Sequence, residues 1–346
     1  MKLALIAFTR RGLALAQGLR QALENEGDIC SLHVPPRLAG DERAPAYESL
    51  PRWTEEAFAC EDGLIFVGAC GIAVRAIAPC LRDKFTDPAV VAVDEGGAWT
   101  LPLLSGHVGG ANALALRVAG ILGGQAAIST ATDVNGLFAV DAWAKSQGLV
   151  LCERALAKKI SAALLEGAEL GFASEFPAET PLPLGFAPGP HGLGFAVTLD
   201  EGSAEFSETL HLIPQILHLG IGCRRGVAPE AIGALADRVL AEHGLSPKGV
   251  VGVETIDLKQ NEPGLLAFCA QRHWPLVAHS ASALAAVPGA FTASDFVAKT
   301  TGVDNVCERA AAFGGRQLLV KKQAADGVTV AIAAEAFALR FEEEEP

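Results

Sequence analysis

Short apolar runs and amphipathic stretches alternate from the start of the chain. Residues 2–8, "KLALIAF", are apolar throughout apart from Lys2, which is typical of a strand covered on both faces. Residues 11–27 repeat leucine at roughly helical spacing and end at a glycine, so they predict a helix. "ICSLHVP" at 29–35 predicts a second strand, and the proline-rich stretch 35–53 predicts a loop. A strand, a helix and a strand in succession indicate a parallel sheet.

The same alternation continues through the next hundred residues. "GLIFVGACGIAVRAIAP" at 63–79 predicts a strand, a turn through Gly68 and Gly71, and a short helix that Pro79 ends. "PAVVAVDEGGAWTLPLL" at 88–104 predicts two strands joined by a hairpin around Glu95-Gly96-Gly97. "LLSGHVGGANALAL" at 103–116 then predicts a strand end, a glycine-rich turn and a helix. A short strand, a polar turn and a helix over about 136–147 follow.

The pattern weakens between residues 150 and 210, where prolines and glycines are frequent. Regular order returns at "QILHLGIGC", residues 215–223, and strands alternate with helices from there on. We therefore predict an α/β protein with three domains and a solvated acidic tail. Its parts are an N-terminal domain with an open, mostly parallel sheet (1–135), a small variable α/β middle domain (136–212), a C-terminal α/β domain (213–341) and the tail (342–346).

Composition narrows the classes of function. The net charge of −13 argues against a nucleic-acid partner, because phosphate binding needs a basic face. No window offers the about 20 clean apolar residues of a membrane span, and the apolar run at the N-terminus is short for a secretory signal, so we expect a cytoplasmic protein. The eight cysteines form no C-x-x-C pair, which argues against a zinc ribbon or a disulfide scaffold. The sequence does not decide whether the protein forms a homodimer.

The turn "SGHVGG" is the most informative short segment. A purely structural turn has no use for the titratable group of His107, whereas acid–base chemistry near neutral pH does. Asp94 and Glu95, at the hairpin one strand away, are expected to orient its second ring nitrogen. "STATDVNG" carries Thr130, Thr132 and Asp133 to the next strand end. Because carboxyl ends of parallel strands share one crevice, these clusters are expected to converge. A satisfied, purely structural histidine is the alternative.

Other motifs are weaker. Gly220-x-Gly222 resembles part of a dinucleotide fingerprint, but the third glycine is one residue late, so a dehydrogenase is only a rival interpretation. No G-x-S-x-G, H-E-x-x-H or Walker motif occurs, and Ser105 is too close to His107 along the chain to be its activated nucleophile. Arg224, beside a glycine turn, suits a carboxylate ligand, because the guanidinium can bind two oxygens at once. Ordinary surface charge is the alternative.

Longer segments resemble a known family. "DEGGAWTLPLLSGHVGGANALALRVAGILGG", "LGIGCRRG" and "KTTGVDNVCERAAAFGGRQLLVKK" are similar, in this order, to the cobalt-precorrin-5A hydrolases of anaerobic cobalamin biosynthesis, the CbiG-type proteins. The segment from about 150 to 212 matches least. That family usually continues "GCRRG" with Thr or Ser, whereas this chain has Val227-Ala228-Pro229. Only the start of the next helix is affected, and proline suits the first helical turn.

The resemblance implies a cobalt-corrinoid substrate with many acetate and propionate side chains. It also implies a reaction in which water opens the δ-lactone of cobalt-precorrin-5A and carbon C20 leaves with its methyl group as acetaldehyde, giving cobalt-precorrin-5B. No cofactor or protein-bound metal is expected, because the substrate carries the cobalt. Neighbouring enzymes of the corrinoid pathway are further candidate partners. The rival from another class is a non-catalytic carrier that protects a corrinoid and passes it on.

On this hypothesis a general base activates water, glycine-turn N–H groups stabilise the oxyanion, and basic side chains hold peripheral carboxylates. The residues expected to carry the chemistry are His107, Asp94, Glu95 and Asp133. The residues expected to hold the substrate are Arg75, Ser105, Gly106, Gly109, Gly110, Asn112, Thr130, Thr132, Gly222, Arg224, Lys259, Glu262, Glu308 and Lys321.

Overall fold

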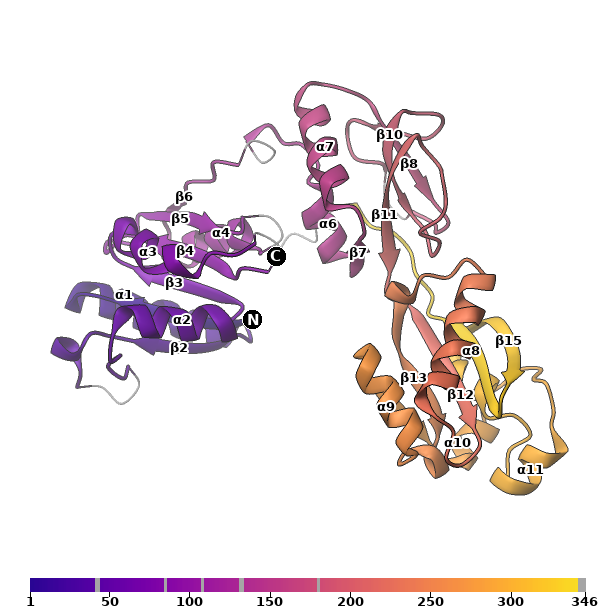
Figure 1. Ribbon diagram of the computed structural model, residues 1–346. Helices are drawn as coiled ribbons and strands as arrows, with labels where there is room; N and C mark the ends of the chain where they lie inside the picture. The colour runs from indigo at the N-terminus through magenta and orange to yellow at the C-terminus, as the bar shows by residue number, and fades with distance from the viewer. Residues whose placement is uncertain (41–43, 84–85, 107–108, 131–133, 179–180, 342–346) are drawn as a thin grey trace. The chain divides into compact units, whose positions relative to one another are not determined.

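The computed structural model describes residues 1–40, 44–83, 86–106, 109–130, 134–178 and 181–341. It consists of two compact units, Met1–Ala142 and Trp143–Pro346. The first unit contains one sheet of six strands, and the second contains two sheets of five strands each (Figure 1). Helices and strands alternate along the chain, so the predicted α/β class is confirmed. Within the described residues, no helix is both long enough and apolar enough to cross a bilayer.

The sheet of the first unit is parallel over most of its width. Its strand order is β2-β1-β3-β4-β5-β6. Neighbours run parallel from β2 to β4, β5 runs antiparallel to β4, and β6 runs parallel to β5. The bounds are β1 (Lys2–Ala7), β2 (Ile29–His33), β3 (Gly63–Val67), β4 (Ala89–Val93), β5 (Trp99–Leu104) and β6 (Gln125–Ala126). The predicted hairpin between β4 and β5 is confirmed.

Helices cover both faces of this sheet. Leucines of α1 (Arg10–Asn25) and α4 (Ala111–Leu122) share one buried cluster with alternate strand residues. Trp53 and Ala73, from α2 (Leu50–Cys60) and α3 (Cys70–Ile77), belong to the cluster on the other face. The predicted loop over 35–53 is wrong at its end, because α2 begins at Leu50. Ser49 caps the helix by accepting from Arg52 N, and proline suits its first turn.

The second unit begins with a small sheet that has the order β7-β11-β10-β8-β9. Only β7 is antiparallel to its neighbour. The elements of this part are α6 (Val140–Ser146), β7 (Leu149–Leu151), α7 (Arg154–Leu165), β8 (Leu170–Ser174), β9 (Phe186–Ala187), β10 (Leu193–Val197) and β11 (Glu208–Pro214). Phe195 lies at its centre, with the rings of Trp143, Phe172 and Phe186 around it at centroid distances of 5.0 to 5.6 Å.

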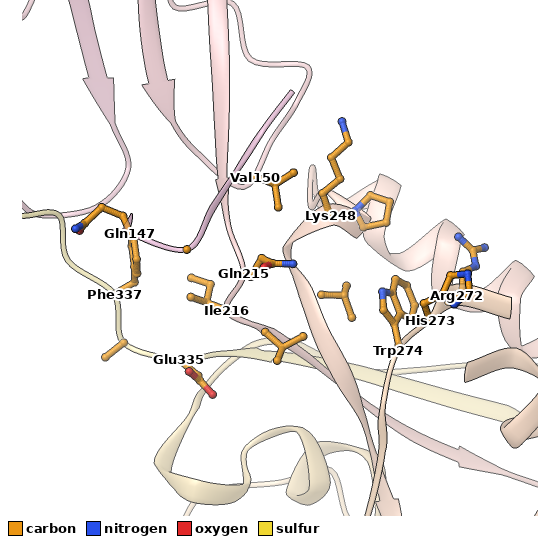
Figure 2. Close-up of a pocket in the computed structure, with 15 residues that line it drawn as sticks. Gln147, Val150, Gln215, Ile216, Lys248, Arg272, His273, Trp274, Glu335 and Phe337 are labelled. Atoms are coloured by element: carbon orange, nitrogen blue, oxygen red, sulfur yellow. The ribbon is translucent and has the colours of Figure 1, made fainter. Parts of the chain in front are cut away.

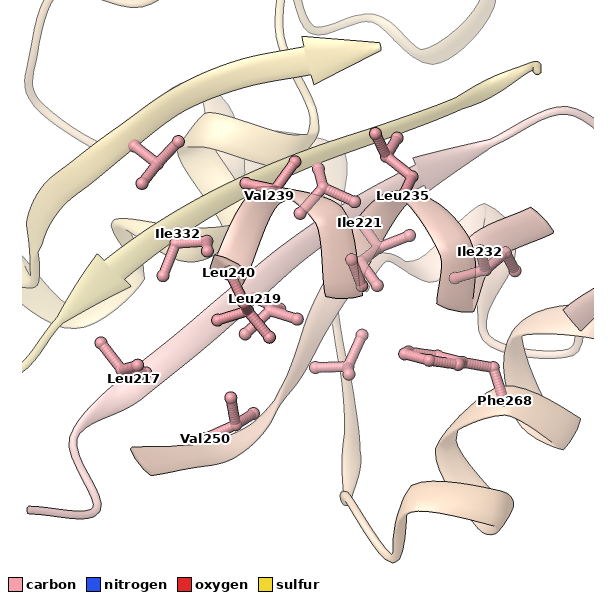
Figure 3. Close-up of a cluster of buried hydrophobic side chains, with 14 of the residues drawn as sticks. Leu217, Leu219, Ile221, Ile232, Leu235, Val239, Leu240, Val250, Phe268 and Ile332 are labelled. Atoms are coloured by element: carbon pink, nitrogen blue, oxygen red, sulfur yellow. The ribbon is translucent and has the colours of Figure 1, made fainter. Parts of the chain in front are cut away.

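The last sheet has the order β14-β13-β12-β16-β15. The strand bounds are β12 (Leu217–Cys223), β13 (Val250–Ile256), β14 (Leu276–His279), β15 (Gln317–Ala325) and β16 (Val328–Ala334). The helix bounds are α8 (Pro229–Glu242), α9 (Pro263–Arg272), α10 (Ala281–Ala285), α11 (Asp295–Thr301) and α12 (Cys307–Ala311). Figure 3 shows Leu217, Leu219 and Ile221 of β12 facing Leu235 and Val239 of α8. Proline opens α8, and no side chain caps it.

Residues 335–341 leave the last sheet and return to the small one. The backbone N–H of Leu339 donates to Pro177 O at 2.9 Å. The indole Nε1 of Trp143 donates to Arg340 O at 2.6 Å, and the ring of Phe341 stacks on that indole with centroids 4.9 Å apart. The C-terminal segment therefore completes the core of the small sheet.

Candidate functional site

The connection from β5 to α4 is the best-defined part of the predicted site. Ser105 has a φ of 58°, in the left-handed region that residues with a Cβ seldom adopt. Its side chain is buried, and its hydroxyl has no hydrogen-bond partner among the described residues. A Cβ on Gly109 would lie 2.1 Å from the Cβ of Ser105, so only glycine fits there. Backbone strain of this kind clusters at functional sites.

Described residues of the two polar clusters around β5 and β6 are in contact. Asn112, buried in the first turn of α4, donates from Nδ2 to the hydroxyl of Thr130 at 2.9 Å. Its backbone N–H donates to Gly106 O at 3.0 Å. A Cβ on Gly106 would lie 2.8 Å from Asn112 Oδ1, and Gly110 has a φ of 84°. The convergence arises because β6 runs parallel to β5 and pairs with its first residues, so the segment that follows β6 continues in the direction in which β5 ends.

His107, Thr132 and Asp133 lie outside the described residues. Their assigned roles remain predictions from the sequence. The six predicted substrate contacts that flank them are all described, and the bonds above bring these together in one small region. Those residues are Ser105, Gly106, Gly109, Gly110, Asn112 and Thr130.

Asp94 and Glu95 do not belong to this region, and their predicted role is corrected. They form the turn at the start of β5, whereas Ser105 follows its end. At about 3.3 Å per residue, the six residues of β5 hold the two groups roughly 20 Å apart. The error came from treating the sheet as parallel throughout, although the predicted hairpin itself reverses the direction of β5.

The carboxylate of Asp94 instead stabilises the hairpin. It accepts hydrogen bonds from Gly96 N at 2.8 Å and from Trp99 N at 2.6 Å. Burial raises the pKa of this carboxyl, but the backbone hydrogen bonds outweigh burial and hold the pKa below its ordinary value. Asp94 is therefore an ionised turn anchor.

Three predicted basic clamps are exposed. Arg75 lies in the last turn of α3, Lys321 lies on the edge strand β15, and Arg224 directly follows β12. The backbone N–H of Arg224 donates to Gly327 O at 2.8 Å, which ties the loop after β12 to the turn between β15 and β16. All three side chains are free to reach a ligand.

Glu262 holds the loop that follows β12. Its carboxylate accepts from Gly226 N at 2.7 Å and from Lys259 Nζ at 2.8 Å. The hydrogen bond from Lys259 is the main reason that the pKa of Glu262 lies below its ordinary value. Only 7% of the residue is exposed, so its predicted contact with substrate is replaced by a supporting role for "GCRRG".

Glu308 is fully buried in α12. Its carboxylate accepts from Thr292 N at 2.7 Å, from Thr292 Oγ1 at 2.8 Å and from Lys322 N at 2.7 Å. A carboxylate with three internal donors and no exposed surface does not meet a ligand. The predicted substrate contact is therefore corrected to an anchor for the segment around residue 292.

The glycines of "GIGC" have a packing role. Both Gly220 and Gly222 lie within β12. A Cβ on Gly220 would lie 1.8 Å from Cys307 O and 2.7 Å from Ala311 N, so α12 packs directly on the bare strand. A Cβ on Gly222 would lie 2.7 Å from Thr329 Oγ1. The spacing that resembles a dinucleotide fingerprint is thus explained by close packing, with a helix against Gly220 and the side chain of Thr329 on β16 against Gly222.

The last sheet contains a buried polar network that was not predicted from the sequence. His218 Nδ1 lies 3.0 Å from Glu254 Oε1, and its Nε2 lies 2.9 Å from Glu335 Oε1. His279 Nε2 lies 2.6 Å from Glu254 Oε2. Arg316 donates to Glu254 Oε1 at 2.9 Å and lies 3.5 Å from Glu335 Oε1. Glu254 is 2% exposed, whereas the side chain of Glu335 is half exposed, so the network reaches the surface at Glu335.

In the sequence, this network is indicated only by one ionisable residue inside each of two apolar runs. Glu254 interrupts "GVVGVETI", and His218 interrupts "QILHLGI". A charged residue in a buried strand needs partners, but the residues in contact are 25 to 117 positions apart along the chain, and only the sheet brings them together. No group of three or more metal-ligating side chains able to hold a metal occurs in the described part of the chain.

The network predicts acid-dependent stability. Burial raises the pKa of Glu254, but the hydrogen bonds from His218 and His279 and the charge of Arg316 outweigh it, so the pKa lies below its ordinary value. The stabilisation is therefore complete above about pH 4.3, the unfolded value, and is lost as the pH falls through the folded value. We expect Glu254→Gln to lower the free energy of unfolding by about 3 kcal/mol at pH 7 and by progressively less below pH 4, in urea titrations.

Glu242→Gln is the matched control for this substitution. Glu242 pairs with Arg238 on the exposed side of α8, where 57% of its side chain is accessible. Its replacement should change stability by less than about 0.5 kcal/mol at either pH. An equal loss in both variants would contradict the stabilising role of the network.

Comparisons with known proteins agree with this architecture. The family described as Cobalamin synthesis G N-terminal matches residues 52–133, and the family described as Cobalamin synthesis G C-terminus matches residues 217–333. The segment between them contains the small sheet. The fold and the two matched segments define a protein of the cobalamin synthesis G class.

Full-length relatives identify the family. The cobalt-precorrin-5A hydrolase of Salmonella typhimurium is 33% identical over 350 residues, which cover 95% of this chain and 97% of that protein. The enzyme of the same name from Priestia megaterium is 30% identical over 355 residues, covering 95% and 94%. The solved structure of a cobalamin biosynthesis protein G homolog from Sulfolobus solfataricus is 19% identical, covers 96% and 97%, and gives a TM-score of 0.42. This chain belongs to the cobalt-precorrin-5A hydrolase family.

Proposed function

We propose that the protein hydrolyses cobalt-precorrin-5A. Water opens the δ-lactone that joins a ring A acetate to C20, and C20 leaves with its methyl group as acetaldehyde, giving cobalt-precorrin-5B. The observation that carries the proposal is the similarity, over 95% of the chain, to two hydrolases that bear this substrate in their names. The proposed setting is the cytoplasm, with no bound cofactor, because hydrolysis transfers no electrons and the substrate carries the cobalt.

The β5–α4 turn is the proposed reaction centre. A general base, His107, takes a proton from the water that attacks the lactone carbonyl. The tetrahedral intermediate expels the C20 alkoxide, which takes up a proton to become a carbinol, and the ring A acetate is left as a free carboxylate. Loss of the hydroxyl proton then turns the C–O bond into C=O, and the ring carbon that held C20 keeps the bonding electrons and takes up a proton. The buried hydroxyl of Ser105 supports this assignment, because it is a polar group without a partner among the described residues and lies two positions before the proposed base in the sequence.

Substrate binding is proposed to use exposed cations. Arg75, Arg224 and Lys321 are accessible in the structure and suit peripheral acetate and propionate groups. In a chain with a net charge of −13, such local cations have to offset the overall repulsion of a polyanionic substrate.

The proposal is tested by incubating the purified full-length protein with cobalt-precorrin-5A without air and measuring acetaldehyde. We expect one acetaldehyde per corrinoid and many turnovers per protein. Stoichiometric corrinoid binding without acetaldehyde would instead support the carrier function. An increase in thermal stability with NAD, in place of the corrinoid, would support the dehydrogenase interpretation.

A further inference from the structure

The second unit contains a pocket of about 780 Å³, within the range of small-molecule sites. It opens where β12 and β13 begin, beside the segment that returns to the small sheet. Figure 2 shows Phe337 and Trp274 on opposite sides of Gln215 and Ile216, which occupy its middle. Aromatic rings separated by aliphatic and amide groups suit a flat, mostly apolar ring system.

Two cations line the pocket and keep free donors. Lys248 Nζ contacts Glu201 and lies 3.4 Å from Cys152 Sγ, and 43% of its side chain is exposed. Arg272 pairs with Asp237, and its guanidinium lies 5.6 Å from the centroid of the Trp274 ring. An ammonium has three N–H donors and a guanidinium has five, so both groups can still bind carboxylates of a ligand.

One wall of the pocket carries a fixed anion. Glu335 lines the pocket and is half exposed, and its Oε1 is held by His218 at 2.9 Å and by Arg316 at 3.5 Å. His218 is in turn held by Glu254, which is buried. A carboxylate held at one oxygen by a hydrogen bond with a histidine and by an ion pair can offer its second oxygen to a hydrogen-bond donor of a ligand. The buried network therefore gives this pocket a preorganised polar wall.

We infer that this pocket binds the corrinoid ring, with Trp274 and Phe337 against the macrocycle, Lys248 and Arg272 on its peripheral carboxylates and Glu335 on a donor group. The inference rests on the substrate class of the proposed function and adds a binding site in the second unit. It identifies Glu335, His218 and Arg316 as positioning and recognition residues outside the β5–α4 turn. Sequence reasoning had placed no ligand contact on any of these seven residues.

The test uses cobyrinic acid, a cobalt corrin with peripheral carboxylates, and the full-length chain. Binding is followed by quenching of tryptophan fluorescence. We expect Lys248→Glu and Arg272→Glu each to weaken binding about tenfold. Trp274→Phe should keep most of the affinity but lose much of the quenching, because the ring contact remains while the nearest indole is removed. Arg238→Glu, a charge reversal on exposed α8, should bind like the wild type.

The outcomes test the pocket assignment separately from the proposed hydrolase reaction. Failure of the wild type to bind cobyrinic acid, or equal affinity of Arg272→Glu and Arg238→Glu, would overturn the pocket assignment. Acetaldehyde release from cobalt-precorrin-5A by the wild type would leave the proposed function intact in either case. Binding that depends on Lys248 and Arg272 without acetaldehyde release would support the pocket and reject the hydrolase reaction.

Discussion

Replacement of His107 by Gln is expected to lower the rate of acetaldehyde release about 100-fold, because glutamine keeps hydrogen-bonding capacity but cannot take up a proton near neutral pH. Corrinoid affinity should stay within about twofold, since the proposed role concerns a proton. The measurement is single-turnover release of acetaldehyde from cobalt-precorrin-5A, together with equilibrium binding of the same corrinoid.

His243→Gln is the matched control for this experiment. His243 follows the last residue of α8, and its Nδ1 contacts Val239 O at 2.9 Å, so it has a local structural role. Its replacement should leave acetaldehyde release unchanged. If His107→Gln behaved like His243→Gln, the base would have to be sought elsewhere, and the strained Ser105 turn would need another explanation.

Substitution of Gly220 by Ala is expected to lower the free energy of unfolding by about 3 kcal/mol or more. The added methyl group would overlap Cys307 O and Ala311 N, which are backbone atoms of α12 and cannot rotate away. The helix must therefore move off the strand. Urea unfolding of the full chain, followed by circular dichroism, measures the loss.

Gly233→Ala provides the opposite expectation in the same unit. Gly233 is buried in α8, but a Cβ there would lie 3.7 Å from the ring of Phe268, an ordinary contact distance. Alanine also removes the helix penalty of glycine, about 1 kcal/mol. We expect this variant to be as stable as the wild type or more so. A loss similar to that of Gly220→Ala would show that the helix contact is not the cause.

The repeated alternation of apolar strands and amphipathic helices was enough to predict the α/β class. Local chemistry also predicted the hairpin at Glu95-Gly96-Gly97 and the start of α8 at Pro229, because both depend on neighbouring residues only. The helix α2 was missed, since Pro51 and the polar residues around it are equally typical of a loop and of a helix start.

Relations across the sheet were harder to predict. The contact of Asn112 with Thr130 is consistent with the predicted convergence of the two polar segments, whereas the separation of Asp94 from Ser105 required the direction of β5. Burial was also not predicted. Glu308 carries a charge that suits a ligand contact, but its carboxylate is buried and accepts hydrogen bonds from the backbone N–H groups of Thr292 and Lys322. Charge alone does not tell a solvated group from an internal one.

The return of the last residues to Trp143 limits how the gene can be divided. A fragment beginning at 213 would carry Phe341 away from the aromatic rings that enclose it, and the fragment ending there would leave an indole without its acceptor. The piece that ends there would have an incomplete interior, whereas the core cluster of the last sheet comes almost entirely from residues 216–334. Expression of the small sheet without the C-terminal segment should therefore fail, although its strand order looks complete.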